Sequence, residues 1–271
     1  MSSVTHLTEV GSTNDWLLAR AQALPDGHWV ITDRQTAGRG RRGRVWNDGA
    51  GNFMGSVLVK ALGQVQQLSF VAALALHDAL THITSARRGE VDSDEARRER
   101  GGANPTPGSA TPSLDLSPAG RGERFTLKWP NDVLLDGTKC SGILLERQGE
   151  ALVIGIGINL AHYPTSTERP ATSLAAAGLA VPTPAAVLDE LAAAFAHWRE
   201  TWATYGFAPI RAAWLARASG VGGRIVARLG SESPQGLFTG LADDGALLMQ
   251  LDDGSTRAIH AGEVFALLWG Y

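Results

Sequence analysis

Hydrophobic spacing along the chain predicts short strands interleaved with amphipathic helices. Apolar residues recur at helical spacing over 66–83 and 187–202, and a shorter helix is expected at about 210–218. A further helix is expected to begin at Ser12 or Thr13, either of which would serve as an N-cap, and to stop at Pro25. Strand patterns are predicted at 4–10, 28–35, 52–60, 142–148 and 151–158, and in the segment that ends at Trp129.

The last part of the chain has a different pattern, in which short strands are separated by Gly and Asp turns. This pattern is typical of a small β-barrel. We therefore expect an α+β domain over 1–218, built on a mixed sheet, followed by a small β domain over 219–271.

Residues 85–124 interrupt the larger domain with Pro, Gly, Ser and charged residues and almost no large apolar side chains. Such a segment cannot offset the entropy of ordering by burial, so we predict a flexible surface insertion. Its RRER sequence at 97–100 has two interpretations, a solvated linker or a contact for an acidic partner.

Charge and cysteine content narrow the function classes. The 271-residue chain has a formal net charge of −3, so binding to DNA or to an anionic membrane through overall charge is not expected. The single cysteine, Cys140, excludes an internal disulfide and a Cys-based zinc site, which favours a reducing compartment. No signal peptide and no run of about 20 apolar residues is visible, so a cytoplasmic protein is expected.

The segment QTAGRGRRGRVW at 35–46 concentrates positive charge and glycine between two predicted strands. Closely spaced glycines let backbone N–H groups approach an anion, and arginine makes bidentate contacts with phosphate. The segment matches neither the Walker A pattern nor the Rossmann fingerprint. An ordered anion-binding loop, a nucleic-acid patch and a solvated turn all remain open from spacing alone.

Two further segments carry weaker signals. In KWPNDVLLDGTKCSG, Lys128, Asp132 and Lys139 surround a turn, where a lysine would neutralise phosphate or carboxylate charge or simply be an exposed hairpin residue. In GIGIN, Gly155 and Gly157 indicate that a flat group, or another element of the protein, packs against the strand.

Taken in chain order, the segments STND, QTAGRGRRGRVW, KWPND followed by KCSG, and GIGIN resemble the motifs of biotin protein ligases, the biotin–[acetyl-CoA-carboxylase] ligases. The resemblance extends from about residue 8 to the C-terminus, apart from 85–124. It implies a mixed α/β catalytic domain related to lipoate ligases, with an SH3-like C-terminal domain. The insertion departs from the family pattern.

The resemblance also implies a reaction in two steps. Biotin, the substrate, reacts with Mg²⁺-bound ATP to give biotinyl-5′-AMP, and a lysine of biotin carboxyl carrier protein then takes up the biotinyl group. The implied partners are the carrier protein of acetyl-CoA carboxylase and related carboxylases, with no nucleic acid, membrane or protein-bound metal. A homodimer is left open. Because the catalytic pattern starts about ten residues after Met1, we expect no helix-turn-helix domain and no role as a transcriptional repressor.

Site residues follow from the resemblance position by position. The biotin contacts implied are Ser12, Thr13, Asn14, Gln35, Arg39, Gly40, Arg41, Lys139, Gly155 and Gly157. The nucleotide contacts implied are Arg39, Arg41, Arg44, Trp46, Asn131 and Asn159, with Trp46 against adenine. The catalytic residues implied are Lys139 and Arg41, and we add the hypothesis that Asp132 assists the incoming lysine amine.

Three rival functions remain at this point. Lipoate ligation is the nearest in chemistry, although the arginine-glycine loop favours biotin. A nucleic-acid-binding module would use the cluster Arg39–Arg44 and would bind with strong salt dependence. A non-catalytic biotin-binding protein would bind biotin and release no pyrophosphate.

Overall fold

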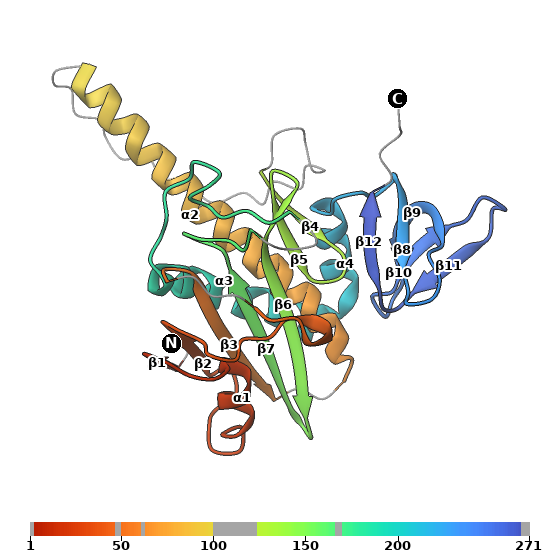
Figure 1. Cartoon of the computed structure of the whole chain (residues 1–271), viewed down its shortest axis with the longest axis horizontal. Helices are drawn as coiled ribbons and strands as arrows, with labels where there is room; N and C mark the ends of the chain where they lie inside the picture. Colours follow the sequence, from red (N-terminus) through yellow and green to blue (C-terminus); the bar gives the residue numbers. More distant parts are fainter. Residues whose placement is uncertain (1–2, 47–49, 61–62, 100–123, 166–169, 267–271) are drawn as a thin grey trace.

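The computed structural model describes residues 3–46, 50–60, 63–99, 124–165 and 170–266, with the helical backbone alone over 86–99. Over these ranges the chain forms a seven-stranded sheet with helices packed against it, and a second sheet of five strands beside it (Figure 1).

The seven-stranded sheet has the strand order β1-β2-β3-β7-β6-β5-β4. The pair β1–β2 is parallel and the other neighbouring pairs are antiparallel, so the predicted mixed sheet is confirmed. In chain order the strands β1 to β7 are Val4–Leu7, Trp29–Thr32, Phe53–Lys60, Phe125–Lys128, Asp132–Leu135, Thr138–Gln148 and Ala151–Ile158.

The two faces of this sheet are covered differently. Three helices, α2 (Leu68–Glu99), α3 (Pro184–Tyr205) and α4 (Phe207–Ala216), build the main hydrophobic core against one face. The short helix α1 (Thr13–Leu18) packs against the other face, where Leu17 joins a small cluster with Leu58 and Val153. Much of this second face is therefore left open for a site.

Two helices differ from their predicted lengths. Helix α1 ends at Leu18, well before Pro25, because the next amides turn back to carbonyls three residues earlier. Helix α2 continues to Glu99, whereas the pattern predicted its end near Ile83 and a flexible segment from 85. Its yellow end projects away from the sheet (Figure 1). Alanine, arginine and glutamate are strong helix formers, so this polar stretch forms helix without apolar periodicity. The remaining part of the insertion, 100–123, lies outside the described residues.

The second sheet is antiparallel, with the order β11-β10-β9-β8-β12, and agrees with the expected small β-barrel. Strands β8 to β12 are Arg224–Arg228, Gln235–Leu241, Leu247–Gln250, Thr256–Ile259 and Glu263–Ala266. The predicted domain boundary at 218/219 lies between α4 and β8, and the domain bounds themselves stay a prediction.

Specific contacts attach the second sheet to the first. The indole Nε1 of Trp129 donates a hydrogen bond to the carbonyl of Gly245 at 3.1 Å. Arg211 on α4 pairs with Asp243 at the same turn. The C-terminal sheet is thereby held beside the turn 129–131, with strand β12 facing the open face of the seven-stranded sheet.

Strand register decides which residues share the open face. Gly157 of β7 lies opposite Gly142 of β6, while Gly155 lies between Leu144 of β6 and Ser56 of β3. Because alternate residues point to the same face, both glycines of the GIGIN segment lie on the α1 side of the sheet. This small-residue floor is where the site forms.

Candidate functional site

A cavity of about 380 Å³ lies on the open face of the sheet, within the range of small-molecule sites. It is bounded by α1, the arginine-glycine loop, the turn after Trp129 and strand β12. All the predicted site residues line it: Ser12, Thr13, Asn14, Gln35, Arg39, Gly40, Arg41, Arg44, Trp46, Asn131, Asp132, Lys139, Gly155, Gly157 and Asn159. The roles given to these residues remain proposals.

The start of α1 forms one wall of the cavity. Ser12 is the N-cap, and its hydroxyl accepts a hydrogen bond from the amide of Asp15. The amide and hydroxyl of Thr13 donate to Oε1 of Gln35 at 2.9 and 3.1 Å. Because Gln35 is the first residue of the arginine-glycine segment, this contact ties α1 to the beginning of the loop.

Asn14 is buried in the same wall and has fixed partners on both sides of its amide. Its Nδ2 donates to Oε2 of Glu146 at 2.7 Å, and its Oδ1 lies 2.6 Å from the Ser56 hydroxyl. A methyl group at Gly155 would stand 2.5 Å from this Oδ1. The missing side chain at Gly155 is therefore what lets the Asn14 amide lie against the sheet.

The arginine-glycine loop crosses the cavity as a folded segment. Arg39 and Val45 form an isolated antiparallel bridge, and a 3-10 turn at Arg41–Gly43 reverses the chain between them. Arg42 has a φ of 58°, a left-handed conformation that is unusual for a residue with a side chain. The loop is thus an ordered element, in agreement with the ordered-loop interpretation of its sequence.

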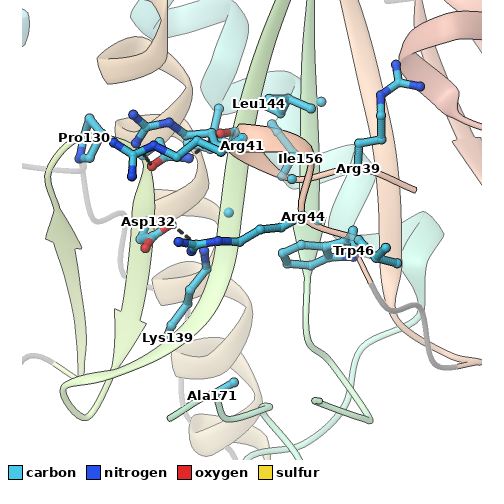
Figure 2. Close-up of a pocket in the computed structure, with 18 of the residues that line it drawn as sticks. Arg39, Arg41, Arg44, Trp46, Pro130, Asp132, Lys139, Leu144, Ile156 and Ala171 are labelled. Atoms are coloured by element: carbon cyan, nitrogen blue, oxygen red, sulfur yellow. Dashed lines mark hydrogen bonds and ion pairs between the residues drawn. The ribbon is translucent and has the colours of Figure 1, made fainter. Parts of the chain in front are cut away.

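Three of the four arginines of the loop, Arg39, Arg41 and Arg44, point to different places. Arg39 makes a bidentate contact with Asp15, at 2.6 Å for both bonds, which raises the pKa of Arg39 and lowers that of Asp15. Arg41 is half-buried, which lowers its pKa, and donates to Oδ1 of Asn131 at 3.0 Å. Arg44 pairs with Glu263 of β12 at 2.6 Å. In Figure 2 the guanidinium of Arg39 points away from those of Arg41 and Arg44.

Lys139 and Asp132 form an ion pair of 2.6 Å on the neighbouring strands β6 and β5. The side chain of Lys139 is one-third exposed and that of Asp132 is only 11% exposed. Both residues line the cavity, as does Arg44. Lys139 is therefore more than an ordinary hairpin lysine, because it faces the cavity together with Arg41 and Arg44.

Trp46 fills the space above Gly157. A methyl group at Gly157 would overlap the indole ring, and one at Gly142 would stand 3.3 Å from it. The flat group predicted against the GIGIN strand is thus, in this conformation, a side chain of the protein. The indole Nε1 is buried and has no hydrogen-bond partner among the described residues. A ligand ring lying on Gly157 would require this ring to move.

Asn159 and Glu263 also line the cavity, and Ser56 and Glu146 hydrogen-bond the Asn14 side chain that lines it. Asn159 donates from Nδ2 to the carbonyl of Thr172, while its buried Oδ1 has no partner among the described residues. Sequence reasoning missed Ser56, Glu146 and Glu263. For Glu146 a signal existed, since it is a charge within the apolar run GILLE, but the role of Glu263 depends on how the second sheet docks.

Comparison with protein families accords with this geometry. The model of the Biotin/lipoate A/B protein ligase family matches residues 5–160, and that of the Biotin protein ligase C terminal domain matches residues 221–267. The first match alone covers more than half of the chain. The chain belongs to the biotin protein ligase family. The resemblance inferred from the motifs and the expected enzyme class, a ligase, are thereby confirmed.

Curated relatives span nearly the whole ligase chain. The biotin–[acetyl-CoA-carboxylase] ligase of Paracoccus denitrificans is 41% identical over 96% of this chain and 98% of its own length. The enzyme of the same name from Mycobacterium tuberculosis is 32% identical over 96% of this chain and 88% of its own.

A solved structure agrees with the ligase fold across both sheets. The biotin protein ligase from Aquifex aeolicus in complex with biotin and ATP has a TM-score of 0.75 at 25% identity, covering 98% of this chain and all of the other. Among the described residues of the present ligase, no helix is long and apolar enough to cross a membrane.

Proposed function

We propose that this ligase activates biotin with ATP as biotinyl-5′-AMP and transfers the biotinyl group to one lysine of a biotin carboxyl carrier protein. The observation that carries the proposal is that Arg41, Arg44 and Lys139 line one cavity (Figure 2), together with Gly155 and Gly157. The names of the Paracoccus and Aquifex relatives support it, because one acts on acetyl-CoA carboxylase and the other binds biotin and ATP.

Cation placement suits the first step. The biotin carboxylate attacks the α-phosphorus of ATP, the new C–O–P linkage forms, and pyrophosphate leaves. Two anions must approach each other, so positive groups that cancel their repulsion lower the barrier. Lys139 and the half-buried Arg41 supply that charge where water is partly excluded. Arg44 lies nearer to β12 and would contact the leaving phosphates.

The second step needs no nucleophilic side chain of the ligase. The amine of the acceptor lysine attacks the acyl carbon, AMP leaves, and the amine loses a proton. Asp132 is buried beside Lys139, which places a carboxylate within the cavity. We infer that Asp132 assists the incoming amine. Asp132→Ala should impair transfer, and full activity of this variant in both half-reactions would contradict the inference.

The described residues also suit Mg²⁺ that arrives with ATP. Mg²⁺ prefers oxygen ligands and takes most of them from phosphates and water. The cavity offers the buried Oδ1 of Asn159 and the carboxylate of Asp132, whereas no cluster of three metal-binding side chains occurs among the residues that the structure describes. Mg²⁺ is thus proposed as part of the substrate complex, where it would neutralise phosphate charge.

One experiment tests the proposal. The ligase is incubated with Mg-ATP and either biotin or lipoate, and pyrophosphate and acyl-adenylate are measured. Biotin should give both products, and the further addition of apo carrier protein should shift the carrier's mass by one biotinyl group. Formation of lipoyl-adenylate alone would reassign the substrate, and binding of biotin without pyrophosphate would make the chain a non-catalytic biotin-binding protein.

The expectations about nucleic acid, transcriptional repression, cellular location and oligomeric state remain predictions. No nucleic-acid contact and no repressor role are expected, and a mobility-shift assay with DNA and RNA at several salt concentrations tests the first. A cytoplasmic location is likewise expected. Oligomeric state is left to sedimentation analysis with and without biotin and ATP.

A further inference from the structure

We propose that Glu146 is a positioning residue that couples the arginine-glycine loop to the floor of the cavity. Its carboxylate sets the orientation of the Asn14 amide and, together with Asp15, holds the guanidinium of Arg39. The proposal rests on the proposed function for the identity of the ligand, and it adds a role for two carboxylates that the motifs did not assign.

The orientation of Asn14 follows from the chemistry of its partner. An ionised carboxylate only accepts hydrogen bonds, so the Asn14 group that faces Glu146 at 2.7 Å must be the donor Nδ2. Oδ1 then points to the Ser56 hydroxyl, which can donate to it. The flipped amide would set Oδ1 against the carboxylate and is therefore disfavoured. Glu146 thus decides which atoms Asn14 presents beside Gly155.

The same carboxylate binds the loop. Nη2 of Arg39 lies 3.2 Å from both oxygens of Glu146. The guanidinium also donates to Asp15, from Nη1 to Oδ2 and from Nη2 to Oδ1. Asp15 belongs to α1 and Glu146 to β6, so one guanidinium spans a helix and a strand. We call this set, Asp15, Arg39 and Glu146, the loop clamp.

The loop clamp changes the expected job of Arg39. The resemblance implies that Arg39 contacts biotin and the nucleotide, yet its guanidinium points away from the Lys139 and Asp132 pair (Figure 2). Held in this way, Arg39 fastens the loop to α1 and β6 at one edge of the cavity, while Arg41 and Arg44 line it elsewhere. The Glu146 carboxylate thus accepts hydrogen bonds from both Arg39 and Asn14. A closed loop should therefore be most stable when the Asn14 amide is oriented with Nδ2 toward Glu146.

Substitutions at Glu146 separate its two jobs. In Glu146→Gln the side-chain oxygen still accepts from Asn14, but the charge that holds Arg39 is lost. In Glu146→Met both interactions are lost. Asp15→Asn weakens the loop clamp without touching Asn14. The matched control is Glu150→Gln, which removes an exposed carboxylate from the turn of the same hairpin.

Two measurements are made on each variant. Trypsin cleavage of the ligand-free protein after Arg41, Arg42 or Arg44, followed by mass spectrometry, reports loop opening. Calorimetric titration with biotin reports affinity. Because cleavage tracks the open population, Glu146→Gln and Asp15→Asn should each be cleaved about two to five times faster than wild type. Glu146→Met should also bind biotin about tenfold more weakly, whereas Glu146→Gln and Asp15→Asn should keep wild-type affinity within about threefold.

Definite results would overturn the inference. Equal cleavage rates in wild type, Glu146→Gln and Asp15→Asn would show that the loop clamp does not hold the loop closed. Equal loss of biotin affinity in Glu146→Gln and Glu146→Met would show that Glu146 does not act by orienting the Asn14 amide. The cleavage assay needs no ligand, so it tests the loop clamp even if wild type fails to bind biotin, which would instead reject the proposed function.

Discussion

The two sides of the cavity are held by different kinds of interaction. On the α1 side, Asn14 and Ser56 are buried and hydrogen-bonded against Gly155. On the loop side, Arg39 and Arg44 are at least one-third exposed and are held by ion pairs to carboxylates. Buried polar groups are costly to leave unpaired, whereas exposed ion pairs contribute only about 0–1 kcal/mol. We therefore expect the α1 side to keep the same conformation with and without ligand, and the loop side to rearrange when a ligand binds.

The largest expected effect concerns Lys139, whose positive charge lies in the cavity between these two sides. Lys139→Met should slow adenylate formation by about 10²–10³-fold, because it removes a preorganised cation from the reacting phosphate. Pyrophosphate release under saturating biotin and ATP measures the effect. Lys60→Met, at an exposed position at the end of β3, is the control. A Lys139→Met enzyme as fast as the control would show that the loop arginines suffice.

The α1 side is tested with Gly155→Ala. The added methyl group would displace the Asn14 amide, so biotin affinity should fall by about 10–100-fold. Calorimetry measures the loss. Gly11→Ala is the matched control, since nothing lies within 4 Å of the position that its methyl group would take. Unchanged affinity in Gly155→Ala would mean that this side of the cavity adapts as readily as the loop.

Trp46 belongs to the loop and its indole ring lies against Gly157 of the sheet. A substitution at Trp46 therefore tests both sides of the cavity together. The motif resemblance implies that Trp46 stacks on adenine, and on that role Trp46→Ala should weaken ATP binding about tenfold. Biotin affinity should stay unchanged or rise, because the space above Gly157 is vacated. Trp46→Phe should restore most of the ATP affinity. A loss of biotin affinity alone in Trp46→Ala would assign the ring to the biotin end of the cavity.

The smallest effect is expected at the link between the loop and the second sheet. Glu263→Gln removes the charge that pairs with Arg44, a residue whose side chain is 52% exposed. Stability should change by less than about 1 kcal/mol, and KM for ATP should change less than about threefold. Chemical denaturation and steady-state kinetics measure these quantities. A large loss of stability would show that this ion pair, rather than Trp129 and its neighbours, holds the second sheet in place.

Sequence patterns predicted the elements well where periodicity was strong, as in β3, β7 and α3. They were wrong where helix propensity acts without apolar periodicity: α2 continues through charged residues to Glu99. They also extended α1 beyond Leu18, because the spacing of apolar residues does not distinguish a helix from successive tight turns. Both differences arise from backbone preferences, helix propensity in α2 and tight turns after α1, that the spacing of apolar residues does not report.

By itself, the sequence determined the fold class, the ligase family and the motif residues that line the cavity, because these depend on short motifs whose glycines, arginines and lysine are local in the chain. Only the tertiary structure decided which groups pair. Glu146 meets Asn14 across 132 positions, and Glu263 meets Arg44 across 219. Such contacts depend on strand register and on the docking of the second sheet, where a shift of one residue would turn Glu146 to the opposite face.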